Sequence, residues 1–301
     1  MVNSPYPRLL STPSSLMTVW QADFYRRPLQ DEAGNLLWEL LLSSADGDFT
    51  YSEVCPQPRV SAAWLQGQFE QLAKTGHSLP QKIQVFRPQT LTLLEVACQE
   101  LAIEVEATRH TPALKRLLQA RSQGYLQDPR HTRQPYDPLA LDRPPPVPLT
   151  ETLWGDRWGF ASYPAGDLLA VFRDRPLPFV AIPPEFLPLK LGIASTIPVP
   201  GVIITGGRRS MQLARWIQET RPVALNYVPG APDGVILEAG LVDRWILTTF
   251  NEVGMRSAGQ EFERRKQATQ GFHFILVQPD ESGMTYSGFW LLQAEQSLSF
   301  G

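Results

Sequence analysis

The chain has 301 residues, of which 43% are hydrophobic, with two cysteines and a formal net charge of −3. This length allows one large domain or two medium ones. The net charge gives no global basic field that would attract nucleic acid. Cys55 and Cys98 are too few for a disulfide scaffold, so a reducing cytoplasm is the expected compartment. The four histidines lack the spacing of a zinc site, and we predict no metal and no cofactor.

Neither a targeting peptide nor a membrane span is predicted. Residues 1–17 are rich in Ser and Pro and have too few arginines for a transit sequence, so we expect a disordered extension or a start-site artefact. The longest uncharged run, Leu191–Gly207, contains Pro198 and Pro200, which would break a spanning helix. We therefore expect no membrane insertion.

Residues 18–125 are predicted to form an N-terminal α/β domain. Thr18–Leu42 contains two aromatic, β-prone runs around an acidic turn with Gly34, a pattern typical of a β-hairpin. Further along the chain, periodicity and capping residues predict strands and helices in alternation. They are a strand at Asp48–Cys55, a helix at Ala62–Lys74, a strand at Lys82–Arg87, a helix at Thr90–Leu101, a strand at Glu104–Arg109 and a helix at Pro112–Arg121. The resulting order, βββαβαβα, begins with the βββαβα order of ribonuclease H.

Residues 126–153, with Pro144-Pro145-Pro146, are predicted to be an extended linker, and residues 154–301 a C-terminal α/β domain. The C-terminal domain should open with a hairpin over Trp154–Phe172 that turns at Gly166-Asp167. Helices are expected at Ser210–Glu219 and Glu261–Thr269. Strands are expected at Phe179–Ile182, Val202–Thr205, Val223–Val228, Gly234–Glu238, Trp245–Thr249, Phe272–Gln278 and Ser287–Leu292. The fold class is thus mixed α/β (α+β), with two mixed-sheet domains of similar size.

Arginine is the preferred cation, at 22 positions against 5 for lysine. Guanidinium groups recognise phosphate through paired hydrogen bonds and also stack on bases, although a GC-rich genome would produce the same bias. Several arginines fall at the ends of predicted strands or helices, where side chains should leave the core. They are Arg26, Arg27, Arg87, Arg109, Arg121, Arg208 and Arg209. With nearby aromatic residues, they predict a surface that grips single-stranded RNA. Solvated arginines beside core aromatics are the alternative interpretation.

Catalytic patterns are incomplete, and we predict no catalytic residue. A ribonuclease-H-type nuclease needs carboxylates around two cations, and Asp23 and Glu70 are available, but Arg87 stands where another carboxylate is needed. A restriction-type nuclease would need a lysine at Gly240. No Gly-x-Ser-x-Gly elbow occurs. The glycines of Ile203–Arg209 could cradle one phosphate or could form a simple tight turn.

Long motifs resemble the Tab2/Atab2 proteins of cyanobacteria and chloroplasts. Departures are modest: Gln21 and Ala22 replace the usual Glu-Leu, and Tyr25 stands where a small residue is common, which weakens Tyr25 as a site candidate. The resemblance is collinear over about residues 18–293. It is carried by Trp20–Pro28, Asp31–Leu40, Phe86–Gln89, Thr108-Arg109, Leu114–Arg121, Trp154–Trp158, Ile236–Gly240 and Gly288–Leu292.

The resemblance implies a non-catalytic RNA-binding factor for translation or assembly of photosystem reaction-centre subunits. Its partners would be single-stranded RNA of an mRNA leader, with the ribosome or assembly factors. The family's Trp-Leu-Leu tripeptide, tied to RNA binding, falls on Trp290, Leu291 and Leu292. Trp290 could be a stacking platform that the two leucines seat in the core. A metal-dependent nuclease of ribonuclease-H-like fold and a protein-interaction scaffold remain the alternatives.

Overall fold

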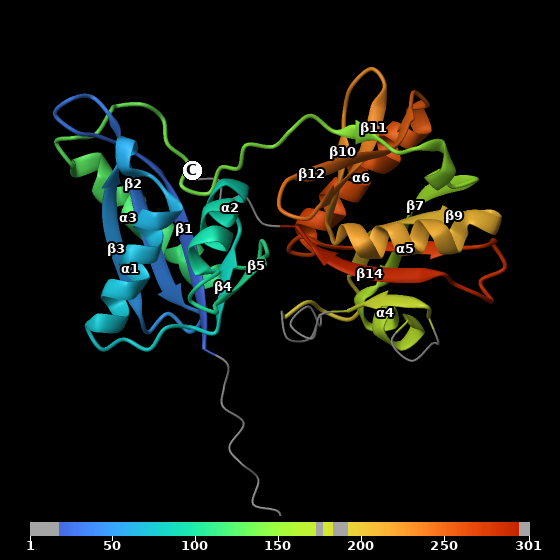
Figure 1. The fold of residues 1–301 in the computed structure, drawn as a ribbon. Helices are drawn as coiled ribbons and strands as arrows, with labels where there is room; N and C mark the ends of the chain where they lie inside the picture. Colours follow the sequence, from blue (N-terminus) through green and yellow to red (C-terminus); the bar gives the residue numbers. More distant parts are fainter. Residues whose placement is uncertain (1–17, 173–176, 183–191, 295–301) are drawn as a thin grey trace, which may run out of the picture. The chain divides into compact units, whose positions relative to one another are not determined.

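A computed structural model describes residues 18–172, 177–182 and 192–294 (Figure 1). The chain divides into two compact units, Met1–Leu141 (unit 1) and Asp142–Gly301 (unit 2). The boundary between them lies inside the predicted linker. The predicted disordered extension, residues 1–17, lies outside the described residues.

In its described residues, unit 1 is a five-stranded mixed sheet with three α-helices, and these elements follow the predicted order βββαβαβα. The strands lie in the order β3-β2-β1-β4-β5, with β1 antiparallel to β2 and parallel to β4. A structural relation to ribonuclease H stays a prediction. The elements are β1 (Val19–Gln30), β2 (Leu36–Ser44), β3 (Thr50–Pro56), α1 (Ala62–Lys74), β4 (Lys82–Val85), α2 (Pro88–Cys98), β5 (Glu104–Ala107) and α3 (Pro112–Gln127).

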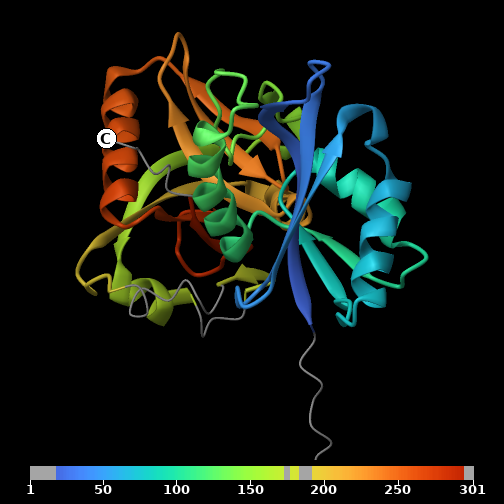
Figure 2. The ribbon, with the colours of Figure 1, turned by 90° about the vertical axis from the view of Figure 1, so that its left-hand side faces the viewer.

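Alternation along β1 assigns its side chains to two faces of this sheet. Trp20 and Phe24 pack into the core under α1 and α2. Gln21 lies on the other face, where its side-chain oxygen accepts the Leu114 backbone N–H of α3 at 3.0 Å. Figure 2 shows α3, in green, on one side of the blue strand β1 and the cyan helices on the other. The sheet is therefore covered on both faces, and polar residues on its α3 face are buried.

Much of the predicted linker packs onto one unit or the other. After α3 the chain returns to β1, where the Thr132 N–H donates to the Pro28 carbonyl at 2.9 Å. Leu139 and Leu141 then pack beside Phe86 in unit 1. In unit 2, the short strand β6 (Val147–Pro148) pairs with β12. The extended segment between the units is thus shorter than residues 126–153.

Unit 2 contains two sheets with the strand orders β10-β11-β12-β6 and β7-β9-β13-β14-β8. One core contains residues of both sheets together with α5 and α6, and a second core lies between the five-stranded sheet and α4. The mixed α/β fold class is confirmed. The remaining elements are β7 (Arg157–Pro164), α4 (Ala165–Phe172), β8 (Phe179–Ala181), β9 (Pro198–Thr205), α5 (Ser210–Thr220), β10 (Pro222–Val228), β11 (Asp233–Ala239), β12 (Asp243–Phe250), α6 (Val253–Ala268), β13 (Phe272–Gln278) and β14 (Gly288–Gln293).

The predicted hairpin over Trp154–Phe172 is wrong, because α4 follows β7 directly. Ala165, Leu168 and Phe172 are buried at spacings of three and four residues, which is the period of a helix rather than of a strand. Asp167 lies in the first turn of α4, where a negative charge is favoured. Among the described residues, no helix is both long and apolar enough to cross a membrane.

Candidate nucleic-acid interface

The Asp23 carboxylate of β1 is held by two guanidinium groups inside unit 1. Its Oδ2 accepts from Arg27 Nη1 at 2.9 Å, and its Oδ1 accepts from Arg87 Nε at 2.9 Å. The Thr90 hydroxyl donates to the same Oδ1 at 3.3 Å. Arg87, the N-cap residue of α2, also donates to two backbone carbonyls of the segment that follows α3. The negative charge of Asp23 is therefore compensated within the protein.

Glu39 of β2 extends this network toward α3. Arg27 Nε donates to Glu39 Oε2 at 3.1 Å, and Arg121 and the Tyr125 hydroxyl donate to the same carboxylate. Burial opposes the charge of Arg27, but Asp23, Tyr136, Tyr125 and Glu39 together outweigh burial, and the pKa of Arg27 is raised. Arg27 therefore stays cationic. We call the five charged residues the arginine–carboxylate cluster: Asp23, Arg27, Glu39, Arg87 and Arg121.

The expectation that the unit 1 arginines leave the core is wrong for three of them. Arg27 and Arg87 are each 2% exposed, and Arg109 is 7% exposed. Strand alternation turns the Arg27 side chain toward α3 and the Arg26 side chain to the opposite face. Arg26 is exposed, and its Cζ lies 5.5 Å from the centre of the Tyr25 ring. Arg121 is partly exposed but engaged by Glu39. A role in RNA binding stays a prediction for these residues, and Arg26 is the exposed one among the unit 1 arginines predicted to bind RNA.

The glycine turn after β9 does not offer a phosphate cradle. The Gly206 N–H donates to the Gln278 carbonyl at 2.9 Å, and the Gly207 N–H donates to the Pro279 carbonyl at 3.1 Å. The Arg209 N–H donates to the Gly206 carbonyl at 2.9 Å. The two glycine N–H groups therefore join β9 to the end of β13, and of the two interpretations left open by the sequence the structure shows the tight turn.

The side chains of Arg208 and Arg209 are both exposed on this turn, as predicted. Arg209 Nη1 donates to the Glu151 carbonyl at 3.0 Å, and Nη2 donates to Asp156 Oδ1 at 2.9 Å. Arg208 forms no ion pair with any residue in the described parts of the chain.

Trp290, Leu291 and Leu292 lie inside unit 2. They are 1%, 2% and 5% exposed on β14, which pairs with β13 and β8. Trp290 and Leu292 face the core shared with α5, and Leu291 faces the core beside α4. Trp290 Nε1 donates to Gln218 Oε1 of α5 at 2.9 Å. No face of the Trp290 indole is open to a base, so the expected stacking platform is wrong, whereas the leucines are in the core as predicted.

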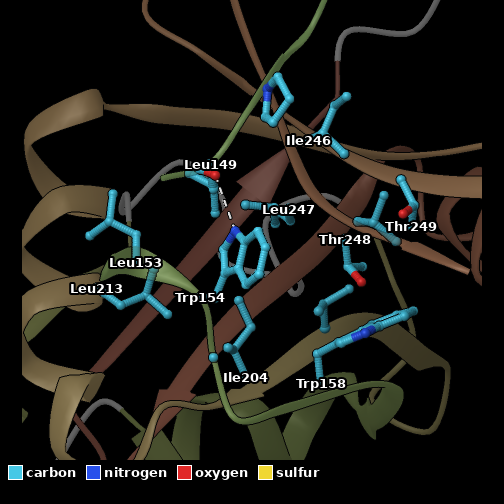
Figure 3. A pocket seen from close by; sticks show the side chains of 14 residues that line it. Leu149, Leu153, Trp154, Trp158, Ile204, Leu213, Ile246, Leu247, Thr248 and Thr249 are labelled. Atoms are coloured by element: carbon cyan, nitrogen blue, oxygen red, sulfur yellow. Dashed lines mark hydrogen bonds between the residues drawn. The ribbon is translucent and has the colours of Figure 1, made fainter. Parts of the chain in front are cut away.

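A different pair of tryptophans lines a cavity of about 320 Å³ in unit 2 (Figure 3). Trp154 is 50% exposed, and its Nε1 donates to the Leu149 carbonyl at 3.1 Å. The remaining wall is largely aliphatic. We call this cavity the indole pocket; its lining includes Trp154, Trp158, Ile204, Leu213, Thr248 and Thr249.

Two family models match this chain, one for each unit. The model of the N-terminal domain of RNA-binding protein Tab2/Atab2 matches residues 19–121, and the model of the C-terminal domain matches residues 136–293. The chain belongs to the Tab2/Atab2 family. The family inferred from the sequence motifs is thereby confirmed, and it is a family of RNA-binding proteins by description.

Plant members of the Tab2/Atab2 family align over nearly the whole chain. The chloroplastic TAB2 homolog of Arabidopsis thaliana is 28% identical over 91% of this chain and 74% of its own length. The chloroplastic TAB2 homolog of Zea mays is also 28% identical, over 91% of this chain and 70% of its own length. Among solved structures, the HTLV-2 integrase catalytic core domain has a TM-score of 0.27 at 12% identity, covering 40% of this chain and 78% of that chain, too low to indicate a shared fold.

Two features of this Tab2/Atab2 chain escape the sequence analysis. The partners of Arg27 were detectable, because Asp23 lies four residues earlier on the same strand face and Glu39 lies on the paired strand. The indole pocket has a weaker signal in the sequence, since Trp154 and Trp158 bracket Gly155 in a motif that predicts the start of a hairpin. The pocket requires β9, β11 and β12 to meet this segment, which local patterns do not reveal.

Proposed function

We propose that this protein binds single-stranded RNA as a non-catalytic factor for translation or assembly of photosystem reaction-centre subunits. In this proposal the RNA is the leader of such an mRNA, and the ribosome or assembly factors are further partners. The compartment is the cytoplasm of a cyanobacterium. The observation that carries the proposal is the match of both units to the two domains of an RNA-binding family.

The state of Asp23 supports the non-catalytic part of the proposal. A metal-dependent nuclease needs carboxylate oxygens that are free to bind divalent cations. Both oxygens of Asp23 already accept hydrogen bonds from guanidinium groups. A cation approaching this carboxylate would meet the positive charges of Arg27 and Arg87 first, so divalent metal binding is disfavoured.

RNA binding is tested with the full chain and fluorescein-labelled RNA octamers in a salt series. The proposal expects retention of RNA with an affinity that falls steeply as salt rises, because phosphate contacts release counterions. The absence of binding at low salt would contradict the proposal and favour a protein-interaction scaffold.

The same labelled RNA incubated with Mg²⁺ or Mn²⁺ tests the non-catalytic assignment. We expect the RNA to remain intact. Cleavage that disappears in Asp23→Asn would establish the nuclease instead. Crosslinking of the protein to RNA in cells, followed by sequencing of the attached RNA, tests the transcript, and reads outside reaction-centre leaders would contradict that part of the proposal.

A further inference from the structure

The Trp154 indole is fixed in orientation while half of its surface is open to solvent. Its Nε1 donates to the Leu149 carbonyl at 3.1 Å, and its backbone N–H donates to the Glu151 carbonyl at 3.2 Å. Figure 3 shows the indole in the middle of the cavity, with the dashed hydrogen bond to Leu149 above it. A large aromatic ring that is held at its polar end can bind a second ring without losing side-chain freedom.

The backbone that carries Trp154 is pressed against β9. A Cβ atom at Gly155 would lie 2.4 Å from Ile204 Cγ2, so only glycine permits this approach. The next residue, Asp156, donates its N–H to the Thr205 carbonyl of β9 at 2.7 Å. These contacts make the indole part of a rigid wall rather than of a loose loop.

The size and chemistry of the indole pocket suit one planar ring. Its volume of about 320 Å³ is at the lower end of small-molecule sites, which are roughly 300 to 1,000 Å³. Ile204 and Leu213 provide apolar wall, as a base requires for its faces. Thr248 and Thr249 of β12 add polar side chains to the lining, and a hydroxyl there can bond to the edge of a base.

Cationic charge lies beside the same wall. The Glu151 carbonyl accepts hydrogen bonds from the Trp154 N–H and from Arg209 Nη1, and it therefore links this guanidinium to the Trp154 backbone. Asp156 compensates the charge of Arg209, whereas the neighbouring Arg208 has no ion-pair partner among the described residues. Because Arg208 is exposed on the same turn as Arg209, we take it as the counter-charge for a phosphate linked to a base in the pocket.

We propose that the indole pocket receives one base of the bound RNA, stacked on Trp154, with Arg208 contacting the adjoining phosphate. This inference rests on the proposed RNA-binding function and assigns that function a site in unit 2. Aromatic stacking with a cation beside it is the usual way in which proteins hold single-stranded nucleic acid.

The inference is tested by comparing the wild type, Trp154→Ala and Trp154→Phe in binding to labelled RNA octamers and to an abasic octamer. We expect Trp154→Ala to weaken octamer binding about 5- to 150-fold, the usual range for loss of one stacked base, and Trp154→Phe to keep most of the affinity. Removal of the bases should weaken binding to Trp154→Ala by a smaller factor than binding to the wild type, because one contact is already lost.

The outcomes distinguish failure of the pocket inference from failure of the proposed RNA-binding function. Failure of the wild type to bind any octamer contradicts the proposed function itself. If the wild type and Trp154→Ala bind the octamers with equal affinity, the pocket inference is overturned. The cavity would then be a site for an apolar side chain of a protein partner. If Trp154→Ala does not fold, ultraviolet crosslinking of wild-type protein to the octamers decides. Adducts on the peptide with Trp154 and Trp158 support the inference, and adducts found only elsewhere overturn it.

Discussion

Two pairs of adjacent arginines, Arg26-Arg27 in unit 1 and Arg208-Arg209 in unit 2, differ in how many guanidinium groups reach solvent. On β1, neighbouring side chains point to opposite faces of the sheet, so Arg26 is exposed and Arg27 is 2% exposed. On the short 3₁₀ turn before α5, both Arg208 and Arg209 are exposed. The backbone conformation that carries an arginine pair thus decides whether one or both can meet a ligand.

The two arginine pairs also differ in their ion-pair partners. Arg27 binds two carboxylates and contributes to the structure of unit 1, whereas Arg208 has no ion-pair partner in the described residues. Buried guanidinium groups that satisfy buried carboxylates act on stability, and exposed ones without partners act on binding. Variants of each kind should therefore change different measurements.

The largest expected effect is on the stability of unit 1. Arg27→Ala leaves Asp23 and Glu39 buried with one cation fewer, which should lower the free energy of unfolding by about 3 to 5 kcal/mol. Urea denaturation followed by circular dichroism measures the change. Arg26→Ala is the matched control, expected within about 0.5 kcal/mol of the wild type. Equal losses in both variants would mean that Arg27 is no more buried than Arg26.

Two tryptophans of unit 2, Trp290 and Trp154, differ in burial and give a second comparison of the same kind. Trp290→Ala removes a buried ring and its hydrogen bond to Gln218, and should cost about 3 to 5 kcal/mol of unfolding free energy. Trp154→Ala, at a half-exposed position, should cost clearly less. Both are measured by urea denaturation. If Trp290→Ala instead lost RNA affinity at full stability, Trp290 would have to be a surface residue.

Local patterns predicted most of the secondary structure, although not α4 or the first half of α6. The spacing of apolar residues predicted α1 at Ala62–Lys74 and β13 at Phe272–Gln278 with the bounds that the structure shows. The failure at α4 had a local cause, because Gly166-Asp167 is typical of a turn and also fits the first turn of a helix.

Exposure was harder to predict because it depends on what packs against each strand. The sequence places Arg87 at a strand end where it is expected to be exposed, but the segment after α3 returns and covers it. Trp290 lies in an aromatic strand near the C-terminus, and its burial depends on α5, which lies about seventy residues earlier in the chain. Contacts between residues distant in sequence therefore decided which predicted site residues are accessible.

A buried histidine in unit 2 contrasts with the buried ion pairs of unit 1. His273 Nε2 accepts the Leu225 N–H at 2.8 Å, and burial, reinforced by Lys266, lowers the pKa of His273 to about 3. Below pH 6.5 the unfolded chain takes up a proton that the folded chain does not, so stability should fall as pH decreases. This group alone should cost about 1.6 kcal/mol between pH 6.5 and 5.

Urea denaturation of the wild type and of His273→Gln at both pH values measures this cost. The variant lacks the titrating group, so its stability should fall less over the same interval, whatever the carboxylates contribute to both proteins. Parallel losses in the two proteins would show that His273 is protonated in the folded state or is accessible to water.

The smallest expected effect concerns Arg208, an exposed arginine of unit 2 that has no ion-pair partner among the described residues. Arg208→Gln removes one guanidinium without an ion-pair partner among the described residues, and should weaken RNA binding roughly threefold to fivefold. Loss of one phosphate contact should also reduce the slope of log affinity against log salt by about 0.7. Arg264→Gln is the control, because Arg264 of α6 is also exposed but forms an ion pair with Glu261. If both variants lowered affinity and slope alike, the effect would reflect net charge rather than a contact beside the indole pocket.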